Sequence, residues 1–165
     1  GCGSTLKEYG TLLANDPEWA ERAEAFSAKI RDLTEHLNVS QFAADDSSLK
    51  VTYHDACHLA HPQGITAEPR ALVKAVVGDN FIELPESDVC CGSAGSYNLT
   101  EPEMAARLQR RKIDNIISTG ADVVVTSNPG CLLQIQSGLR KAGVKVRVMH
   151  IADFLATGLS GPPSD

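Results

Sequence analysis

The chain has 165 residues, of which 42% are hydrophobic, and a net charge of −6. This length suits one domain with a sizeable core, and the negative charge argues against nucleic acid as a partner, because phosphates are bound by basic surfaces. No apolar run approaches the roughly 18 residues that a membrane-spanning helix needs, so we expect no transmembrane segment.

Helical patterns dominate the N-terminal part of the chain. The pattern is weak over residues 4–14 and becomes clear at Asp16 and Pro17, which are typical of a helix N-cap and first turn. Apolar residues then recur at intervals of three and four, which predicts one helical stripe that packs on the rest of the domain. They are Trp19, Ala23, Phe26, Ile30, Leu33 and Leu37. The polar residues 38–48 indicate an exposed linker.

Beyond this linker, short apolar runs alternate with helical patterns. Strands are expected at 50–54, 80–84, 122–126 and 145–149, and helices at 68–77, 102–119, 129–142 and 151–156. This alternation predicts an α/β fold in which helices cover both faces of a parallel sheet of roughly four strands. We therefore divide the chain into an N-terminal helical segment with its linker (1–48), an α/β domain (49–158) and a flexible tail (159–165).

The densest basic run lies within the helix expected at 102–119. It consists of Arg107, Arg110, Arg111 and Lys112. At this spacing, in a chain with negative net charge, the run is more typical of one solvated helix face than of a binding patch. We therefore expect all four side chains to face solvent.

Four cysteines follow the ends of predicted strands. Cys57 comes after the first strand, Cys90 and Cys91 after the second, and Cys131 after the third. Since the carboxyl ends of parallel strands meet at one edge, where open sheets bind ligands, we expect these thiols to lie close together around a common ligand. The odd total of five cysteines does not suit a secreted disulfide scaffold and indicates reduced thiols in the cytoplasm.

The local sequence at two of these positions favours metal binding. Side chains of adjacent strand residues point to opposite faces, so Cys90 and Cys91 can reach one ligand only where the backbone is irregular. Gly92 and Gly95 permit such a turn, whose N–H groups can surround an anion or an iron–sulfur cluster. Cys131 falls in the first turn of a predicted helix, where the helix dipole stabilises a thiolate.

Three histidines, His54, His58 and His61, lie close to Cys57 in the sequence. Each could be a nitrogen ligand or a proton-coupled group, and each could equally cap a helix or hydrogen-bond within the loop. The ordinary structural role is the more common one. We retain His58 as the cofactor-binding candidate of the three.

Several kinds of site fit four converging thiols. Four thiolates suit either zinc or an iron–sulfur cluster, and the lack of paired C-x-x-C knuckles makes a small zinc module the weaker alternative. A redox disulfide between Cys90 and Cys91 would leave the other two thiols unexplained. A nucleophilic cysteine enzyme is also open, since histidine and cysteine are both abundant at this edge.

Three motifs resemble the cysteine-rich CCG repeat shared by heterodisulfide reductases, lactate-utilisation proteins and the iron–sulfur subunit of glycolate oxidase. They are YHDACH at 53–58, CCGSAG at 90–95 and SNPGC at 127–131, with 32 residues between Cys57 and Cys90 and 39 between Cys91 and Cys131. The longer runs GCGSTLKEYG, CCGSAGSYNL and SNPGCLLQI are most similar to the glycolate oxidase iron–sulfur subunits.

The resemblance implies an electron-relay subunit of a glycolate or related 2-hydroxy-acid dehydrogenase complex. A flavin subunit carrying FAD would oxidise the substrate, and this chain, inactive alone, would pass electrons to an acceptor through a [4Fe–4S] cluster. The location implied is the cytoplasm, with contact to the inner membrane through partners. The implied cluster ligands are Cys57, Cys90, Cys91 and Cys131, and the implied surrounding residues are Gly92, Ser93, Gly95 and His58.

The resemblance also implies that more chain precedes this one. Full-length members carry two ferredoxin-type motifs and then two CCG repeats, whereas this sequence has no C-x-x-C-x-x-C run. We expect it to be the second repeat plus the tail of the first, with Cys2 as the closing metal ligand of that first repeat. Gln134 stands where the fuller pattern has a further cysteine, which argues against a five-cysteine cluster. A zinc-stabilised or metal-free docking module and a thiol/disulfide enzyme of the heterodisulfide reductase type remain alternatives.

Overall fold

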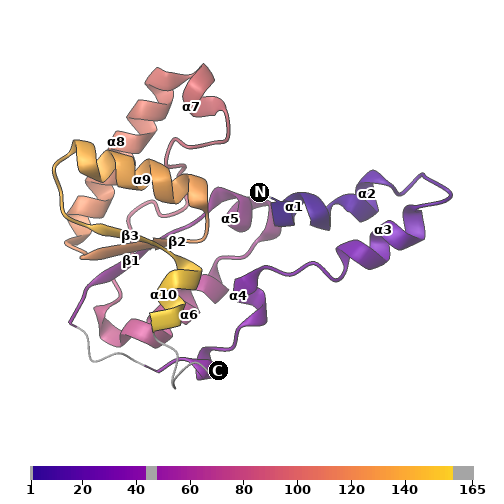
Figure 1. Ribbon diagram of the computed structural model, residues 1–165, viewed down its shortest axis with the longest axis horizontal. Coiled ribbons are helices and arrows are strands. Elements are labelled where there is room, and N and C mark those ends of the chain that lie inside the picture. The colour runs from indigo at the N-terminus through magenta and orange to yellow at the C-terminus, as the bar shows by residue number, and fades with distance from the viewer. Residues whose placement is uncertain (1, 44–47, 158–165) are drawn as a thin grey trace.

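A parallel three-stranded sheet forms the centre of the computed structural model, which describes residues 2–43 and 48–157 (Figure 1). The strands are β1 (Val51–His54), β2 (Val123–Thr126) and β3 (Arg147–His150), in the order β1-β2-β3. All pairings are parallel and in step, so that His54, Thr126 and His150 lie side by side where the strands end. The carboxyl ends of the three strands therefore share one edge of the sheet.

Helices cover both faces of this sheet, as the alternating pattern predicted. The helices α6 (Ala67–Val77) and α10 (Ile151–Thr157) lie on one face, and α8 (Pro102–Thr119) and α9 (Pro129–Lys141) lie on the other (Figure 1). Successive β2 residues point to opposite faces. Val123 and Val125 therefore belong to a first core with α6 and α10, and Val124 belongs to a second core with α8 and α9.

The predicted strand at 80–84 is wrong, so the sheet has three strands rather than roughly four. After the short 3₁₀ helix η2 (Gly78–Asn80), Phe81 forms a single bridge with Val51, and the Ile82 N–H donates to the Val51 carbonyl (2.8 Å). Phe81 packs against the first core and Leu84 belongs to the second. The segment passes from one layer to the other around the edge of the sheet, and therefore it cannot continue along β1.

The expected N-terminal helices are confirmed. They are α1 (Cys2–Lys7), α2 (Tyr9–Leu12), α3 (Ala20–Ser27), α4 (Leu33–His36) and the 3₁₀ helix η1 (Val39–Gln41). The helices α2 and α3 form a hairpin that projects away from the sheet, whereas α4 packs against α6 (Figure 1). None of the helices in the described part of the chain has both the length and the apolar character required to cross a membrane. The predicted tail, 159–165, lies outside the described residues.

The single apolar stripe expected to pack on the domain does not form. The chain leaves the helical path after α3, and Asp32 starts α4 with a capping box, in which its carboxylate accepts from the Thr34 N–H (2.9 Å) and Glu35 accepts from the Asp32 N–H (2.7 Å). Of the stripe residues, Trp19 and Phe26 are 43% and 44% exposed. The strong N-cap at Asp32 thus outweighs the continuous apolar period.

Candidate metal centre

The carboxyl-end edge of the sheet carries two of the predicted thiols. The helix α5 (Cys57–Gln63) begins soon after β1, and Cys57 is its first residue. The helix α9 follows β2, and Asn128 caps it by accepting from the Cys131 N–H (3.1 Å). Since β1 and β2 are parallel, Cys57 and Cys131 both start from the same edge of the sheet.

The loop that carries Cys90 and Cys91 has the irregular backbone that the sequence predicts. Gly92 and Gly95 have φ values of 85° and 61°, and Ala94 between them has 32°, all in the left-handed region. The Gly92 N–H donates to the Cys90 sulfur (3.3 Å). Backbone N–H groups of the loop therefore approach sulfur, an arrangement typical of loops that surround anions and iron–sulfur clusters.

Three buried side chains meet where this loop lies against the sheet. The candidate ligand atoms of His54, Cys91 and Cys131 all lie within 4.8 Å of one another. Val51 and Tyr53 belong to the first core, so strand alternation turns His54 towards the second core, which contains Cys91 and Cys131. We call His54, Cys91 and Cys131 the donor group.

Burial and hydrogen bonding favour the neutral forms of the Cys91 thiol and the His54 imidazole. Hydrogen bonding with Cys131, together with burial, raises the pKa of the Cys91 thiol to about 12. Hydrogen bonding with Cys91, together with burial, also raises the pKa of Cys90. Burial lowers the pKa of His54 to about 4, and the charge of Lys112 acts in the same direction. At neutral pH the thiols of Cys90 and Cys91 are therefore protonated and the imidazole of His54 is neutral. A bound cation would displace the thiol protons and stabilise the thiolates.

Lys112 brings a buried ammonium group close to this site. The residue is 1% exposed, and its Nζ donates to the backbone carbonyls of Glu86 and Ser87. Burial lowers its pKa, while the nearby groups, Cys91 first among them, act to raise it. Lys112 therefore holds the start of the cysteine loop against α8 and places positive charge beside the thiol of Cys91.

A buried ion pair joins β1, α6 and the same loop. Arg70 donates to both carboxylate oxygens of Asp55 (2.8 and 2.6 Å) and to the Ser87 hydroxyl (2.8 Å). The Asp55 side chain is 3% exposed and that of Arg70 is 20% exposed. Asp55 follows His54 directly, so this pair fixes the end of β1 at the donor group.

Replacing Arg70 with methionine should therefore destabilise the protein. Arg70→Met leaves the Asp55 carboxylate buried without its partner, and we expect a loss of about 3 kcal/mol in the free energy of unfolding, the low end for breaking a buried pair. Urea unfolding followed by circular dichroism measures it. The control is Lys74→Met, which removes an exposed pair with Glu83, whose side chain is 57% exposed, and should cost under about 1 kcal/mol. Equal losses in the two variants would contradict this account.

The other predicted site residues lie around the donor group or outside it. Cys90 and Cys57 are partly buried but do not belong to the donor group. Cys2 is exposed on α1. His58 is exposed on α5. Ser93 reaches the start of α9, since a Cβ added to Gly130 would lie 2.9 Å from its Oγ.

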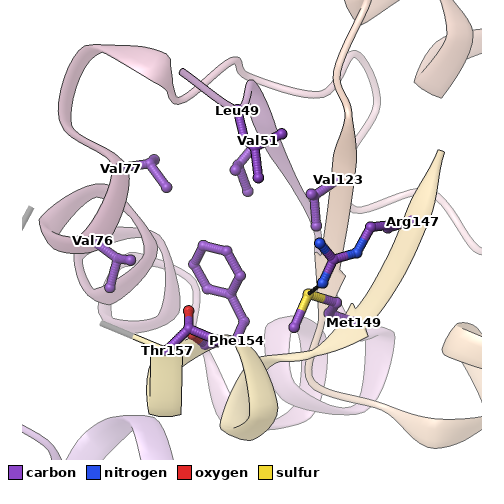
Figure 2. Close-up of a pocket in the computed structure, with 9 residues that line it drawn as sticks. All are labelled: Leu49, Val51, Val76, Val77, Val123, Arg147, Met149, Phe154 and Thr157. Atoms are coloured by element: carbon purple, nitrogen blue, oxygen red, sulfur yellow. Dashed lines mark hydrogen bonds between the residues drawn. The ribbon is translucent and has the colours of Figure 1, made fainter. Parts of the chain in front are cut away.

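A separate cavity lies at the opposite edge of the sheet (Figure 2). It has a volume of about 170 Å³ and is lined by the first residue of each strand, Val51, Val123 and Arg147, together with apolar side chains such as Phe154. Its one guanidinium, that of Arg147, donates to the Met149 sulfur (3.3 Å). No cysteine lines this cavity, so the thiol chemistry belongs to the other edge.

Two residues at the site were not selected from the sequence. His54 is one of three candidate histidines in the sequence, but the strand pattern at 50–54 does not show which face of the strand leads to the cysteines. The expectation that Lys112 faces solvent is wrong, since this residue is buried. It lies in line with Ala105, Gln109 and Ile116 on the buried side of α8, and this helical spacing was the signal that could have identified it.

The chain belongs to the CCG cysteine-rich domain family, whose model matches residues 51–136. This range contains the donor group, Cys57 and Cys90.

Curated relatives cover almost the whole chain. It is 44% identical over 161 residues to a Bacillus subtilis protein named "Probable glycolate oxidase iron-sulfur subunit", a match covering 94% of this chain and 36% of that protein. It is 32% identical to "Lactate utilization protein A" of Oceanobacillus iheyensis and 34% identical to the protein of that name from Exiguobacterium sp., covering 97% and 96% of this chain and 67% and 66% of those proteins. The chain thus spans about a third of the first relative's length.

Proposed function

We propose that this chain is the electron-transfer part of an iron–sulfur subunit in a glycolate oxidase complex. The observation that supports this most is the donor group itself, in which buried Cys91, Cys131 and His54 meet within 4.8 Å in a chain 44% identical to a protein named as such a subunit. A bound cluster would accept and release single electrons. Reduced thiols are consistent with this role, since all five cysteines are free.

The ligands proposed for a [4Fe–4S] cluster are Cys57, Cys90, Cys91 and Cys131. Cys91 and Cys131 already lie together, and Cys90 is hydrogen-bonded to Cys91. Cys57 stands at the same edge of the sheet, at the start of α5. These four residues fit a [4Fe–4S] cluster chemically, because such clusters are held by four cysteine thiolates.

The loop and one histidine are proposed to surround the cluster. Gly92, Ser93 and Gly95 would direct backbone N–H groups towards its sulfur atoms, as the Gly92 N–H is directed towards Cys90. Such hydrogen bonds are one means by which a protein sets a cluster's reduction potential. His58, exposed on the first turn of α5, would lie at the rim.

The partners proposed are flavin subunits that carry FAD and oxidise glycolate or a related 2-hydroxy acid. We also propose that a ferredoxin-like part of the same protein completes the electron path, and that residues 1–48 continue a preceding repeat with Cys2 as its closing ligand. The length of the first relative, of which this chain covers 36%, supports this. The complex would be cytoplasmic and reach the inner membrane through its partners.

Zinc is the second candidate, favoured by the compactness of the donor group. Zinc binds sulfur at about 2.3 Å and nitrogen at about 2.0 Å in tetrahedral sites, so two ligand atoms of one ion lie about 3.5–3.8 Å apart. The ligand atoms of the donor group lie within 4.8 Å of one another, so a zinc ion would draw them closer together. A zinc ion would make the chain a stabilised docking module without redox activity.

Metal analysis of the intact protein tests the proposal. Anaerobically purified protein should contain iron and acid-labile sulfide, and show a broad visible absorption that bleaches on reduction. Cys131→Ser should reduce the iron and sulfide per chain relative to the unaltered protein. Stoichiometric zinc without sulfide at this site would refute the iron–sulfur function and support the docking module instead.

A further inference from the structure

We infer that His54 is a nitrogen ligand of the metal centre, beside the thiolates of Cys91 and Cys131. The inference rests on the proposed function, because it assigns a residue to the metal of that same site. It departs from the ligand set expected above, which consists of cysteines only.

The first argument is the unsatisfied state of the imidazole. His54 is 1% exposed, and neither Nδ1 nor Nε2 has a hydrogen-bond partner in the part of the chain that the structure describes. The Ser87 backbone is near enough to act on the pKa of the ring but does not meet hydrogen-bond geometry. Buried polar atoms in proteins nearly always have a partner. An imidazole buried in this way, with candidate ligand atoms of Cys91 and Cys131 within 4.8 Å, is suited to a metal ion that occupies the space between them.

The second argument is the rigidity with which the ring is held. His54 ends β1, paired with Thr126 of β2, and the ion pair of Asp55 with Arg70 fixes the next residue. The ring can therefore turn about its side-chain bonds but cannot leave the donor group. Metal ligands need this kind of support from the residues around them.

A partner for the second ring nitrogen is also present. A histidine that binds metal through one nitrogen usually donates the other N–H to a nearby acceptor. The Thr126 hydroxyl lies opposite His54 in the strand register, is fully buried and likewise has no hydrogen-bond partner among the described residues. It is therefore available to accept this N–H and to set the orientation of the ring.

The third argument is that the donor group has only two thiols. Gln134 stands three residues after Cys131, so α9 supplies one thiol, and Cys57 lies outside the 4.8 Å group. His54 supplies the third donor from the sheet itself, in the place that the cysteine ligand set gives to Cys57. Histidine in place of cysteine raises the reduction potential of an iron–sulfur centre, so His54 would also make this centre easier to reduce.

Pulsed electron paramagnetic resonance of the reduced intact protein tests the inference directly. We expect a strong nitrogen coupling that changes to the ¹⁵N pattern when the protein is labelled with ¹⁵N-histidine. In His54→Cys we expect iron content to be kept, the strong coupling to be lost and the reduction potential to fall. His36→Gln, which alters an exposed histidine on α4, should keep both the coupling and the potential.

The outcomes separate this inference from the proposed function. Iron-loaded protein without a strong histidine coupling, or a coupling that survives in His54→Cys, overturns the role of His54 and leaves the iron–sulfur function standing. If the protein holds zinc instead, the proposed iron–sulfur function is refuted. X-ray absorption at the zinc edge then tests whether His54 is a ligand. One nitrogen per zinc, lost in His54→Cys, supports the inference, and zinc bound by sulfur alone overturns it. Protein that binds neither metal overturns both.

Discussion

Cys91→Ser is expected to remove the metal from this site while the protein still folds. Cys91 lies within 4.8 Å of both His54 and Cys131. Even residues that only support a ligand change metal affinity about 10- to 100-fold, so we expect at least a tenfold loss of metal affinity at this site. The buried hydroxyl should cost about 1–3 kcal/mol of stability. Metal and sulfide analysis, with circular dichroism melting, measures both effects.

Two other cysteines serve as comparisons for this variant. Cys90→Ser should have a smaller effect, because Cys90 is partly exposed and lies outside the donor group. Cys2→Ser should leave the metal at this site unchanged, since Cys2 is exposed on α1. Full metal content and unchanged absorption in Cys91→Ser would show that Cys91 is only a small buried residue and would refute its assignment as a ligand.

Gly92→Ala should be the most destabilising single change in the cysteine loop. Gly92 has a φ of 85°, and a Cβ added there would lie 2.3 Å from the Ala105 carbonyl oxygen of α8. Left-handed backbone alone costs a residue with a Cβ about 1–3 kcal/mol, and backbone cannot yield as a flexible side chain could. We expect a total loss of about 3 kcal/mol or more, because the overlap adds to this strain, together with reduced metal content as Cys91 is displaced.

Gly95→Ala provides the matched control. Gly95 also has a left-handed φ, 61°, but among the described residues no atom beyond its chain neighbours lies within 4 Å of an added Cβ. The variant should therefore carry only the backbone cost of about 1–2 kcal/mol and keep its metal. Urea unfolding of both variants, with metal analysis of each, makes the comparison. Similar destabilisation in the two would mean that contact with α8 does not restrict the loop at Gly92.

Local sequence patterns were enough to predict the class of fold and the edge of the sheet from which Cys57 and Cys131 start. The runs ending at His54 and Thr126 are short, apolar and followed by helices, a pattern that only a parallel sheet covered on both faces explains well. Cysteines placed after such strands must start from one edge, whatever the details of packing. The turn at Gly92 and Gly95 was predictable for a similar local reason, because adjacent thiols cannot converge on a regular strand.

The path of residues 80–84 and the break in the N-terminal helical stripe depend on tertiary packing and could not be predicted from local pattern. Residues 80–84 have the composition of a strand, but their path between the two cores limits them to one bridge, between Phe81 and Val51. The N-terminal apolar stripe has helical spacing, yet the cap at Asp32 interrupts it.

The choice among histidines and basic residues also needed the assembled fold. His54 rather than His58 meets the thiols, because strand alternation directs it towards α8 and α9 while His58 lies on the exposed side of α5. Lys112 is buried although its three arginine neighbours in the basic run are exposed. Consecutive residues of a helix point in different directions, so Arg111 faces solvent while Lys112 faces the core. Burial, partners and distance depend on what packs opposite a residue, and neighbours in the sequence do not specify this.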